Sequence, residues 1–374
     1  MNHVVEKMPE RVVEKAPDKK EQAKKDRLDA FWERFALLKP FLEQEGVEEI
    51  AVNELGKVSL WKSGVWETVE VPDLNETFLE RIGANLSGYT EKPFNRQNTS
   101  LSTYLPTGER VEMTHPPTAP EGMMYLNIRK HSASAFPHAA LIAQGYYKNV
   151  QHEFSLTLTE EDRARYQPYL TEEEAKLWQL AKDGEWAEFM QKAVEFYLNI
   201  VVSGATGSGK TSYCRSLIEL ISVDDRIITV EDTPEMPLPN HPNKNRLLFK
   251  KNPEDPQGAT AKDVLHSVMR KTPKRVLLAE LRGDEAMFYL SGVLSSGHPG
   301  GITTTHANSP RDAFFRLALL ILASDAGKSL DMKTILMLLH MTINVVVQLK
   351  FDVAKGRHVP AIYYDPMYRL SMLG

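Results

Sequence analysis

The chain has 374 residues, of which 42% are hydrophobic and 25% charged, which is enough apolar material for roughly two to three globular domains. Its 45 lysine and arginine residues against 50 aspartate and glutamate residues give a net charge of −5. A negative net charge excludes a protein that binds nucleic acid or an anionic membrane through its overall electrostatic field. The single cysteine, Cys214, excludes a disulfide framework within the chain and a zinc site built from several cysteines, and it favours a reducing, cytoplasmic setting.

Residues 1–28 are rich in both signs of charge and poor in aromatic residues, which predicts a charged flexible tail that is frayed or helical. This stretch has no apolar core of the kind that a signal peptide needs. The apolar stretch 334–349 is shorter than the ~20 residues that span a bilayer, and polar residues interrupt it. We expect it to be a helix followed by a buried strand, and we expect no transmembrane segment.

Residues 29–140 are predicted to form a smaller α+β N-terminal domain. Apolar residues recur at helical spacing in 29–44, and a second helix is predicted over 78–86. Short runs with the composition of strands, separated by turn residues, make up the rest: 49–52, 58–61, 65–71, 111–114 and 124–128.

Residues 141–190 are predicted to be a helical linker, in which a charged stretch precedes two helices that are separated at Gly184. Thr171 is the predicted N-cap of the first of these helices.

From residue 191 to 374, strands alternate with helices, which predicts an α/β domain with a mostly parallel sheet. The predicted strands are 198–203, 227–230, 276–279, 302–305, 343–349 and 361–364. The predicted helices are 211–221, 261–270, 284–295, 310–322 and 332–339.

The strongest motif is Gly-Ala-Thr-Gly-Ser-Gly-Lys-Thr at 204–211, which matches the phosphate-binding loop and lies between an apolar strand and a helix. Glycines let consecutive backbone N–H groups face phosphate oxygens, and the helix N-terminus adds partial positive charge. Lys210 would reach the β- and γ-phosphates, and the Thr211 hydroxyl would hold Mg²⁺. The alternative is a glycine-rich turn that only closes a strand–helix unit. The candidate nucleotide-binding residues here are Gly204, Ala205, Thr206, Gly207, Ser208, Gly209, Lys210, Thr211 and Ser212.

Acidic residues follow two of the predicted strands, at the sheet edge where ligands bind in open α/β folds. Glu280 is placed to orient or deprotonate the water that attacks a γ-phosphate, or alternatively to pair with the nearby Arg282. Glu231 and Asp232 could hold Mg²⁺ directly or through water, whereas the alternative is a solvated acidic turn.

His306 follows a third predicted strand, in the run Thr-Thr-Thr-His-Ala-Asn. Its imidazole could donate to a γ-phosphate or to Glu280 and so report which nucleotide is bound. Taken alone, such a histidine is more often a packing residue.

Four segments, SGATGSGKTS, ITVEDTPEMPL, RVLLAELRGDEA and SSGHPGGITTTHAN, resemble the boxes of the secretion ATPase superfamily in its own order. This superfamily comprises the ring-forming traffic ATPases of type II secretion, type IV secretion and type IV pili, and the boxes are its phosphate loop, aspartate box, Walker B and histidine box. The resemblance is strong over 203–308. It implies a RecA-like P-loop domain that binds ATP and Mg²⁺.

The segments STYLPTGERVEMTHPP and MYLNIRKHS resemble the N-terminal domain of the type IV secretion members. In that subfamily one arginine from each segment approaches the nucleotide, and the resemblance therefore assigns this role to Arg110 and Arg129. A permanently charged, forked guanidinium suits the developing charge of a γ-phosphate. The single cysteine excludes the zinc-bearing type II motors of the superfamily.

The resemblance implies an ATP-hydrolysing motor that powers a type IV secretion system, in substrate transfer or pilus biogenesis. It further implies a homo-hexameric ring, peripheral at the cytoplasmic face of the bacterial inner membrane, that contacts a second ATPase, a coupling protein and an inner-membrane scaffold. A pilus or type II secretion motor, a nucleic-acid translocase and a nucleotide-gated scaffold remain alternatives. Direct nucleic-acid binding is not expected, given the net charge and the lack of an aromatic–basic motif.

Overall fold

The computed structural model describes residues 19–62, 64–130, 137–249 and 258–373. It divides the chain into two compact units, Met1–His131 and Ser132–Gly374, each of which is described here by itself. The division falls before the boundary at 140 that the sequence predicts. Residues 1–18 of the predicted tail lie outside the described residues, and from Lys19 the chain is helical.

The first unit is a six-stranded antiparallel sheet in the order β3-β2-β1-β6-β5-β4, with helices packed against it. Side chains alternate along the strands, so that Val111 of β5 and Ile128 of β6 enter a core that also holds Ile82 of a helix. The strands are β1 (Val47–Glu54), β2 (Lys57–Lys62), β3 (Val65–Glu70), β4 (Ser100–Tyr104), β5 (Arg110–Thr114) and β6 (Tyr125–Arg129). The helices are α1 (Lys19–Arg34), α2 (Lys39–Glu43) and α3 (Glu76–Thr90).

Two details of this unit differ from the sequence-based expectations. The predicted helix over 29–44 is interrupted, because α1 ends at Arg34 and Pro40 lies in the first turn of α2. Proline has no N–H group with which to continue a helix from the preceding turn. Strand β4 was not predicted, since in Ser-Leu-Ser-Thr-Tyr only Leu101 and Thr103 are buried and the apolar alternation is weak.

The second unit contains an eight-stranded sheet in the order β10-β9-β11-β12-β8-β13-β14-β7, which confirms the predicted α/β class. Its pairs are parallel, except that β14 runs antiparallel to β13. The strands are β7 (Gln151–Glu153), β8 (Ile200–Gly204), β9 (Ile227–Glu231), β10 (Lys244–Leu248), β11 (Arg275–Leu278), β12 (Ile302–Thr305), β13 (Val345–Asp352) and β14 (Gly356–Tyr364).

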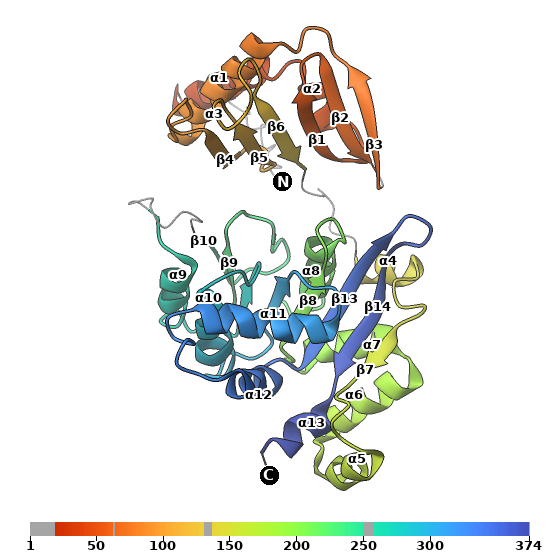
Figure 1. The fold of residues 1–374 in the computed structure, drawn as a ribbon. Coiled ribbons are helices and arrows are strands. Elements are labelled where there is room, and N and C mark those ends of the chain that lie inside the picture. Colours follow the sequence, from red (N-terminus) through yellow and green to blue (C-terminus); the bar gives the residue numbers. More distant parts are fainter. Residues whose placement is uncertain (1–18, 63, 131–136, 250–257, 374) are drawn as a thin grey trace, which may run out of the picture. The chain divides into compact units, whose positions relative to one another are not determined.

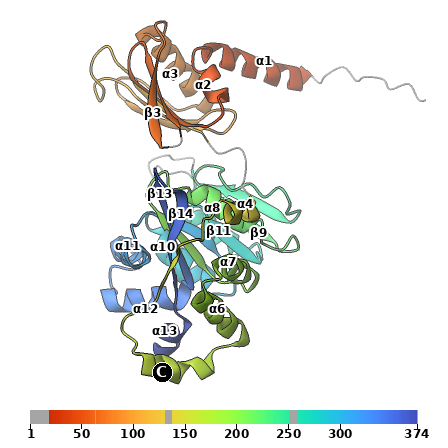
Figure 2. The same ribbon diagram turned by 90° about the vertical axis from the view of Figure 1, so that its right-hand side faces the viewer.

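Helices cover both faces of this sheet, as expected for parallel strands that are buried on both sides (Figures 1 and 2). Val202 faces the core that α6, α7 and α8 complete, and the neighbouring Val201 faces the core that α9, α11 and α12 complete. The helices are α4 (His138–Ala143), α5 (Glu160–Tyr166), α6 (Glu172–Asp183), α7 (Trp186–Glu195), α8 (Lys210–Ile218), α9 (Ala261–Val268), α10 (Glu285–Met287), α11 (Pro310–Ala323), α12 (Met332–Thr342) and α13 (Pro366–Ser371).

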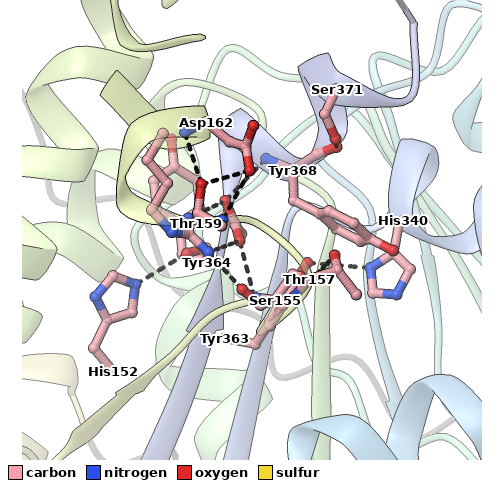
Figure 3. Close-up of polar contacts among 12 residues, drawn as sticks. His152, Ser155, Thr157, Thr159, Asp162, His340, Tyr363, Tyr364, Tyr368 and Ser371 are labelled. Carbon is pink, nitrogen blue, oxygen red and sulfur yellow. Dashed lines mark hydrogen bonds and ion pairs between the residues drawn. The ribbon is translucent and has the colours of Figure 1, made fainter. Parts of the chain in front are cut away.

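Residues 141–190, predicted as a linker, lie within the second unit. Strand β7 extends the sheet beside β14, and α6 and α7 pack on the core. The segment is also tied to the C-terminal region, where Ser155 N–H donates to Asp365 Oδ2 at 2.9 Å and Arg163 forms a buried ion pair with Asp365. Nearby, Nε2 of His152 in β7 lies 2.9 Å from the backbone carbonyl oxygen of Tyr364 in β14 (Figure 3). The predicted cap is present, because the Thr171 hydroxyl accepts from the backbone N–H of Glu174.

The predicted helix over 284–295 is α10 followed by a π-helix, Phe288–Leu294. Gly292 lies in this π-helix. A Cβ at this position would lie only 3.1 Å from the Phe288 ring, so a glycine leaves room for the ring. The stretch 334–349 is a helix followed by a buried strand, as predicted. Among the residues that the structure describes, no helix is both long and apolar enough to cross a membrane.

Candidate active site

The carboxyl ends of four neighbouring parallel strands meet at one edge of the second sheet. Strands β9, β11, β12 and β8 lie side by side in that order. Gly204 ends β8 and Glu231 ends β9, whereas Glu280 lies two residues beyond β11 and His306 directly follows β12. The motifs predicted separately from the sequence are therefore brought to the edge at which open α/β sheets bind ligands.

The phosphate loop connects β8 to α8 through residues whose backbone requires glycine. Gly207 and Gly209 have φ angles of 78° and 93°, in the left-handed region. At Gly204, a Cβ would lie 2.7 Å from the Leu349 carbonyl oxygen, so the loop starts against the backbone of β13. Within the loop Ala205 and Thr206 are exposed, Ser208 is buried, and Thr211 and Ser212 at the start of α8 are half-buried.

Lys210 is buried beneath the loop, and its ammonium group contacts both the loop and the histidine. Its Nζ lies 2.7 Å from Gly204 O and 3.0 Å from Ala205 O, and 3.3 Å from Nδ1 of His306. The ammonium group is thus held at the base of the loop, next to the position where the loop would receive phosphate oxygens.

A continuous chain of polar contacts runs from this lysine to the aspartate box. His306 Nε2 lies 3.3 Å from Glu280 Oε1, and Arg282 bonds the other oxygen of the same carboxylate. Arg282 Nη1 is also 3.2 Å from Asp232 Oδ2. The hydrogen bond to Glu280 raises the pKa of the Arg282 guanidinium. Glu280 therefore forms the Arg282 pair that the sequence analysis offered as the alternative to a role as base, and it also contacts His306.

His306 is held in place by a residue that sequence reasoning missed. The buried Gln348 of β13 donates from Nε2 to the carbonyl oxygen of Ala307 at 3.1 Å. Ala307 directly follows the histidine, and Ser203 of β8 also donates to its carbonyl, at 3.4 Å. No signal in the sequence links Gln348 to His306, because about forty residues separate them and only the pairing of the strands brings them together.

Glu231, at the end of β9, is buried and bonded within the protein. Its side chain is fully buried, and its oxygens accept hydrogen bonds from the Thr229 hydroxyl at 2.7 Å and the Met236 N–H at 2.6 Å. Arg246 is 3.4 Å away, and burial raises the pKa of the Glu231 carboxyl. Both oxygens of Glu231 thus accept hydrogen bonds from the protein, and its role toward Mg²⁺, directly or through water, stays a prediction.

A second acid on the same turn, Glu235, contacts the start of α8. The Thr211 hydroxyl donates to Glu235 Oε2 at 3.1 Å, and Arg215 donates to the Glu235 backbone carbonyl at 2.6 Å. The sequence shows Glu235 as a further acid four residues after Glu231. It does not show which of the two side chains the turn directs toward Thr211. The internal bonds of Glu231 set that direction.

The oxygen donors near the loop suit Mg²⁺ that arrives with a nucleotide. Thr211 supplies a hydroxyl, and Glu235 and Asp232 supply carboxylates on the turn after β9. Mg²⁺ takes one or two such groups and completes its coordination with water and phosphate oxygens. The described residues contain no group of three histidine, cysteine or acidic side chains that could hold a metal by themselves.

Arg110 and Arg129 lie in the first unit, at the start of β5 and the end of β6. They are directly opposite each other in the antiparallel pair, and Glu49 of β1 is opposite Arg129 on its other side. Like charges directly opposite each other destabilise a sheet. Glu49 places an opposite charge beside this pair.

Comparisons with known proteins identify a matching family and similar chains. Residues 173–353 match the family model described as type II/IV secretion system protein. The type IV secretion system protein VirB11 of Brucella suis biovar 1 is 35% identical over 333 residues, which is 88% of each chain.

Two solved structures are also similar. The crystal structure of the VirB11 ATPase from the Brucella suis type IV secretion system, in complex with sulphate, has a TM-score of 0.51 at 33% identity, with 94% of this chain and 99% of that chain covered. The pilus retraction motor PilT with bound ADP has a TM-score of 0.53 over 92% of this chain and 85% of its own, but at 14% identity it shows the fold alone.

Proposed function

This chain belongs to the family of type II/IV secretion system proteins and is a type IV secretion ATPase, and we propose that it hydrolyses Mg-ATP at the edge of the eight-stranded sheet described above. The observation that carries the proposal is the chain of contacts from Lys210 through His306 to Glu280. It joins a phosphate-binding cation to a carboxylate that can act as a base. The nucleic-acid translocase and nucleotide-gated scaffold alternatives are not favoured, nor is a pilus or type II motor.

The phosphate loop would bind the triphosphate through its backbone N–H groups and the N-terminus of α8. Lys210 Nζ would exchange its bonds to the Gly204 and Ala205 carbonyls for phosphate oxygens. Mg²⁺ supplies neutralisation of charge on the β- and γ-phosphate oxygens when it is bound. Thr211 would hold it through the hydroxyl, and Glu235 and Asp232 would orient its water ligands.

Glu280 would accept a proton from the attacking water as the water oxygen bonds to the γ-phosphorus and ADP leaves. His306 contacts both Lys210 and Glu280. It would therefore contact a bound γ-phosphate and change its contact with Glu280, the base, according to whether that phosphate is present. Arg282 holds the second oxygen of Glu280 and fixes the direction in which the carboxylate faces.

Arg110 and Arg129 would approach the nucleotide when the first unit closes on the second. Closing and opening would then couple hydrolysis to work on the secretion machinery. The position of both arginines at neighbouring strand ends, directly opposite each other, supports a shared role for them.

Replacing Arg129 with alanine should lower ATP turnover by about tenfold or more while changing nucleotide affinity much less, because the arginine acts on charge that develops in the transition state. The measurement is steady-state phosphate release together with ADP binding by calorimetry. Arg81→Ala, an exposed arginine of the same unit, is the matched control. An unchanged turnover rate in the Arg129 variant would refute its role.

Replacing Glu235 with glutamine should raise the Mg²⁺ concentration needed for half-maximal ATPase activity by about tenfold, the usual effect of removing an outer-shell metal partner. Glutamine keeps the shape of the side chain but lacks the negative charge that orients metal-bound water. The assay is a Mg²⁺ titration at fixed ATP, with the exposed Glu219→Gln as control. Equal Mg²⁺ requirements in the two variants would remove Glu235 from the metal site.

We further propose a homo-hexameric ring at the cytoplasmic face of the inner membrane that contacts a second ATPase, a coupling protein and an inner-membrane scaffold. The similarity to type IV secretion proteins supports the assignment of this chain to such a system. Complementation of a host that lacks this gene, with DNA transfer, effector secretion and pilus production scored separately, tests that assignment. Restored secretion or transfer supports it, and restoration of none of the three contradicts it.

A further inference from the structure

The hairpin of β13 and β14 contacts the phosphate loop at two places, through Leu349 and through Arg357. Leu349 of β13 is directly opposite Gly204 in the parallel pairing with β8. Its carbonyl oxygen lies so close that any side chain at Gly204 would collide with it. The hairpin returns through β14, and Arg357 at the start of that strand reaches the far side of the same loop.

Arg357 contacts two of the loop's glycines. Its Nε donates to the Gly207 carbonyl oxygen at 3.3 Å. A Cβ built on Gly209 would lie 2.9 Å from Cδ of Arg357, so the aliphatic part of the side chain lies directly on the backbone there. The guanidinium lies over the ring of Phe351 at 5.5 Å from its centroid, and this contact within the hairpin fixes its direction.

The contact with Gly207 determines which way the next N–H group points. In a trans peptide the C=O and N–H groups point in opposite directions. Because the Gly207 carbonyl faces Arg357, the Ser208 N–H faces into the loop, where it donates to Ala205 O at 3.3 Å. Phosphate binding by such a loop requires carbonyl groups to face outward, and the bond to Arg357 holds the Gly207 carbonyl in that direction.

We propose that Arg357 is a positioning residue of the nucleotide site, which holds the phosphate loop from outside so that its N–H groups face the triphosphate. The inference rests on the proposed ATPase function and adds to it a residue that lies 150 positions after Gly207 and in none of the four boxes. Arginine suits the role, because its guanidinium is permanently charged and its planar fork loses little freedom when it is held.

The test compares Arg357→Ala with Lys355→Ala in the full chain. Lys355 is an exposed cation on the same hairpin, so its removal changes the local charge equally without touching the loop. Loss of a hydrogen bond from a charged donor should raise KM for ATP about tenfold in Arg357→Ala. Turnover at saturating ATP should stay within about twofold, because the loop binds substrate and transition state alike. Lys355→Ala should match the wild type.

Arg357→Lys keeps the charge but lacks the Nε donor, and it should show a raised KM as well. Calorimetric titration with Mg-ADP should show the same loss of affinity, and it also measures binding if an alanine variant folds poorly. Equal KM values for Arg357→Ala and Lys355→Ala would overturn the proposal, as would a loss of turnover with KM unchanged. A wild-type chain that neither binds nor hydrolyses ATP would instead overturn the proposed function itself.

Discussion

Replacing Lys210 with alanine is expected to abolish measurable ATP turnover, with a loss of at least about 10²- to 10³-fold, as for other groups that stabilise transition-state charge. The ammonium group is buried at the base of the phosphate loop and lies within contact of His306. Without it, the loop loses the cation that would bind the β- and γ-phosphates. His306 also loses the contact through which it would respond to a bound γ-phosphate. Phosphate release from ATP at saturating Mg²⁺ measures the effect.

Lys333→Ala is the matched control, since this lysine of α12 is exposed and takes no part in the proposed site. It should retain the wild-type rate. Thermal unfolding of both variants separates lost chemistry from lost fold, because Lys210 also bonds the Gly204 and Ala205 carbonyls. Retained turnover in a folded Lys210→Ala protein would remove the phosphate-loop assignment.

Replacing Glu280 with glutamine is expected to leave ATP bound but unhydrolysed. Glutamine has the shape of glutamate and cannot accept the proton of the attacking water, so the rate should fall about 10²- to 10⁴-fold, the range for loss of a general base. The backbone geometry should persist, because the amide oxygen can still accept from Arg282. Single-turnover hydrolysis of radiolabelled ATP, with bound nucleotide recovered and identified, is the measurement.

In that experiment the Glu280→Gln protein should yield mainly ATP, whereas the wild type and the exposed-site control Glu219→Gln should yield ADP. Rapid product formation by the Glu280 variant would reject its role as the base. Loss of nucleotide binding without any trapped ATP would show that the carboxylate contributes to affinity rather than to proton transfer.

The parts of the site that lie at the ends of parallel strands could be predicted from the sequence. The loop at 204–211, Glu280 and His306 each follow a predicted strand, and parallel strands bring such ends to one edge. The alternation of strands and helices therefore places these residues at the same edge even before strand order is known. The α/β class follows from the same alternation of strands and helices.

What the sequence could not predict depends on the path of the chain after a strand ends. Glu231 and Glu235 are both acids on one turn, and only the hydrogen bonds inside it decide that the first is buried and the second contacts Thr211. Gln348 and Arg357 contact the site through the pairing of β13 with β8, a contact between distant segments that no local pattern encodes.

The segment 141–190 was difficult to assign for a similar reason. Its charged composition and short strand β7 are typical of a linker. Its attachment comes from tertiary contacts instead, above all the buried pair of Arg163 and Asp365, which are about two hundred residues apart. A strand of three residues at a sheet edge has too little periodicity to be recognised before its partner is known.

The structure of the Glu280→Gln protein with ATP and Mg²⁺ bound is the most direct test of a hydrolytic site at this sheet edge. We predict that the triphosphate lies in the loop at 204–211, with the γ-phosphate within hydrogen-bond distance of Lys210 and His306 and the metal on the Thr211 hydroxyl. A triphosphate bound elsewhere, or one whose γ-phosphate faces away from His306 and position 280, would contradict the account.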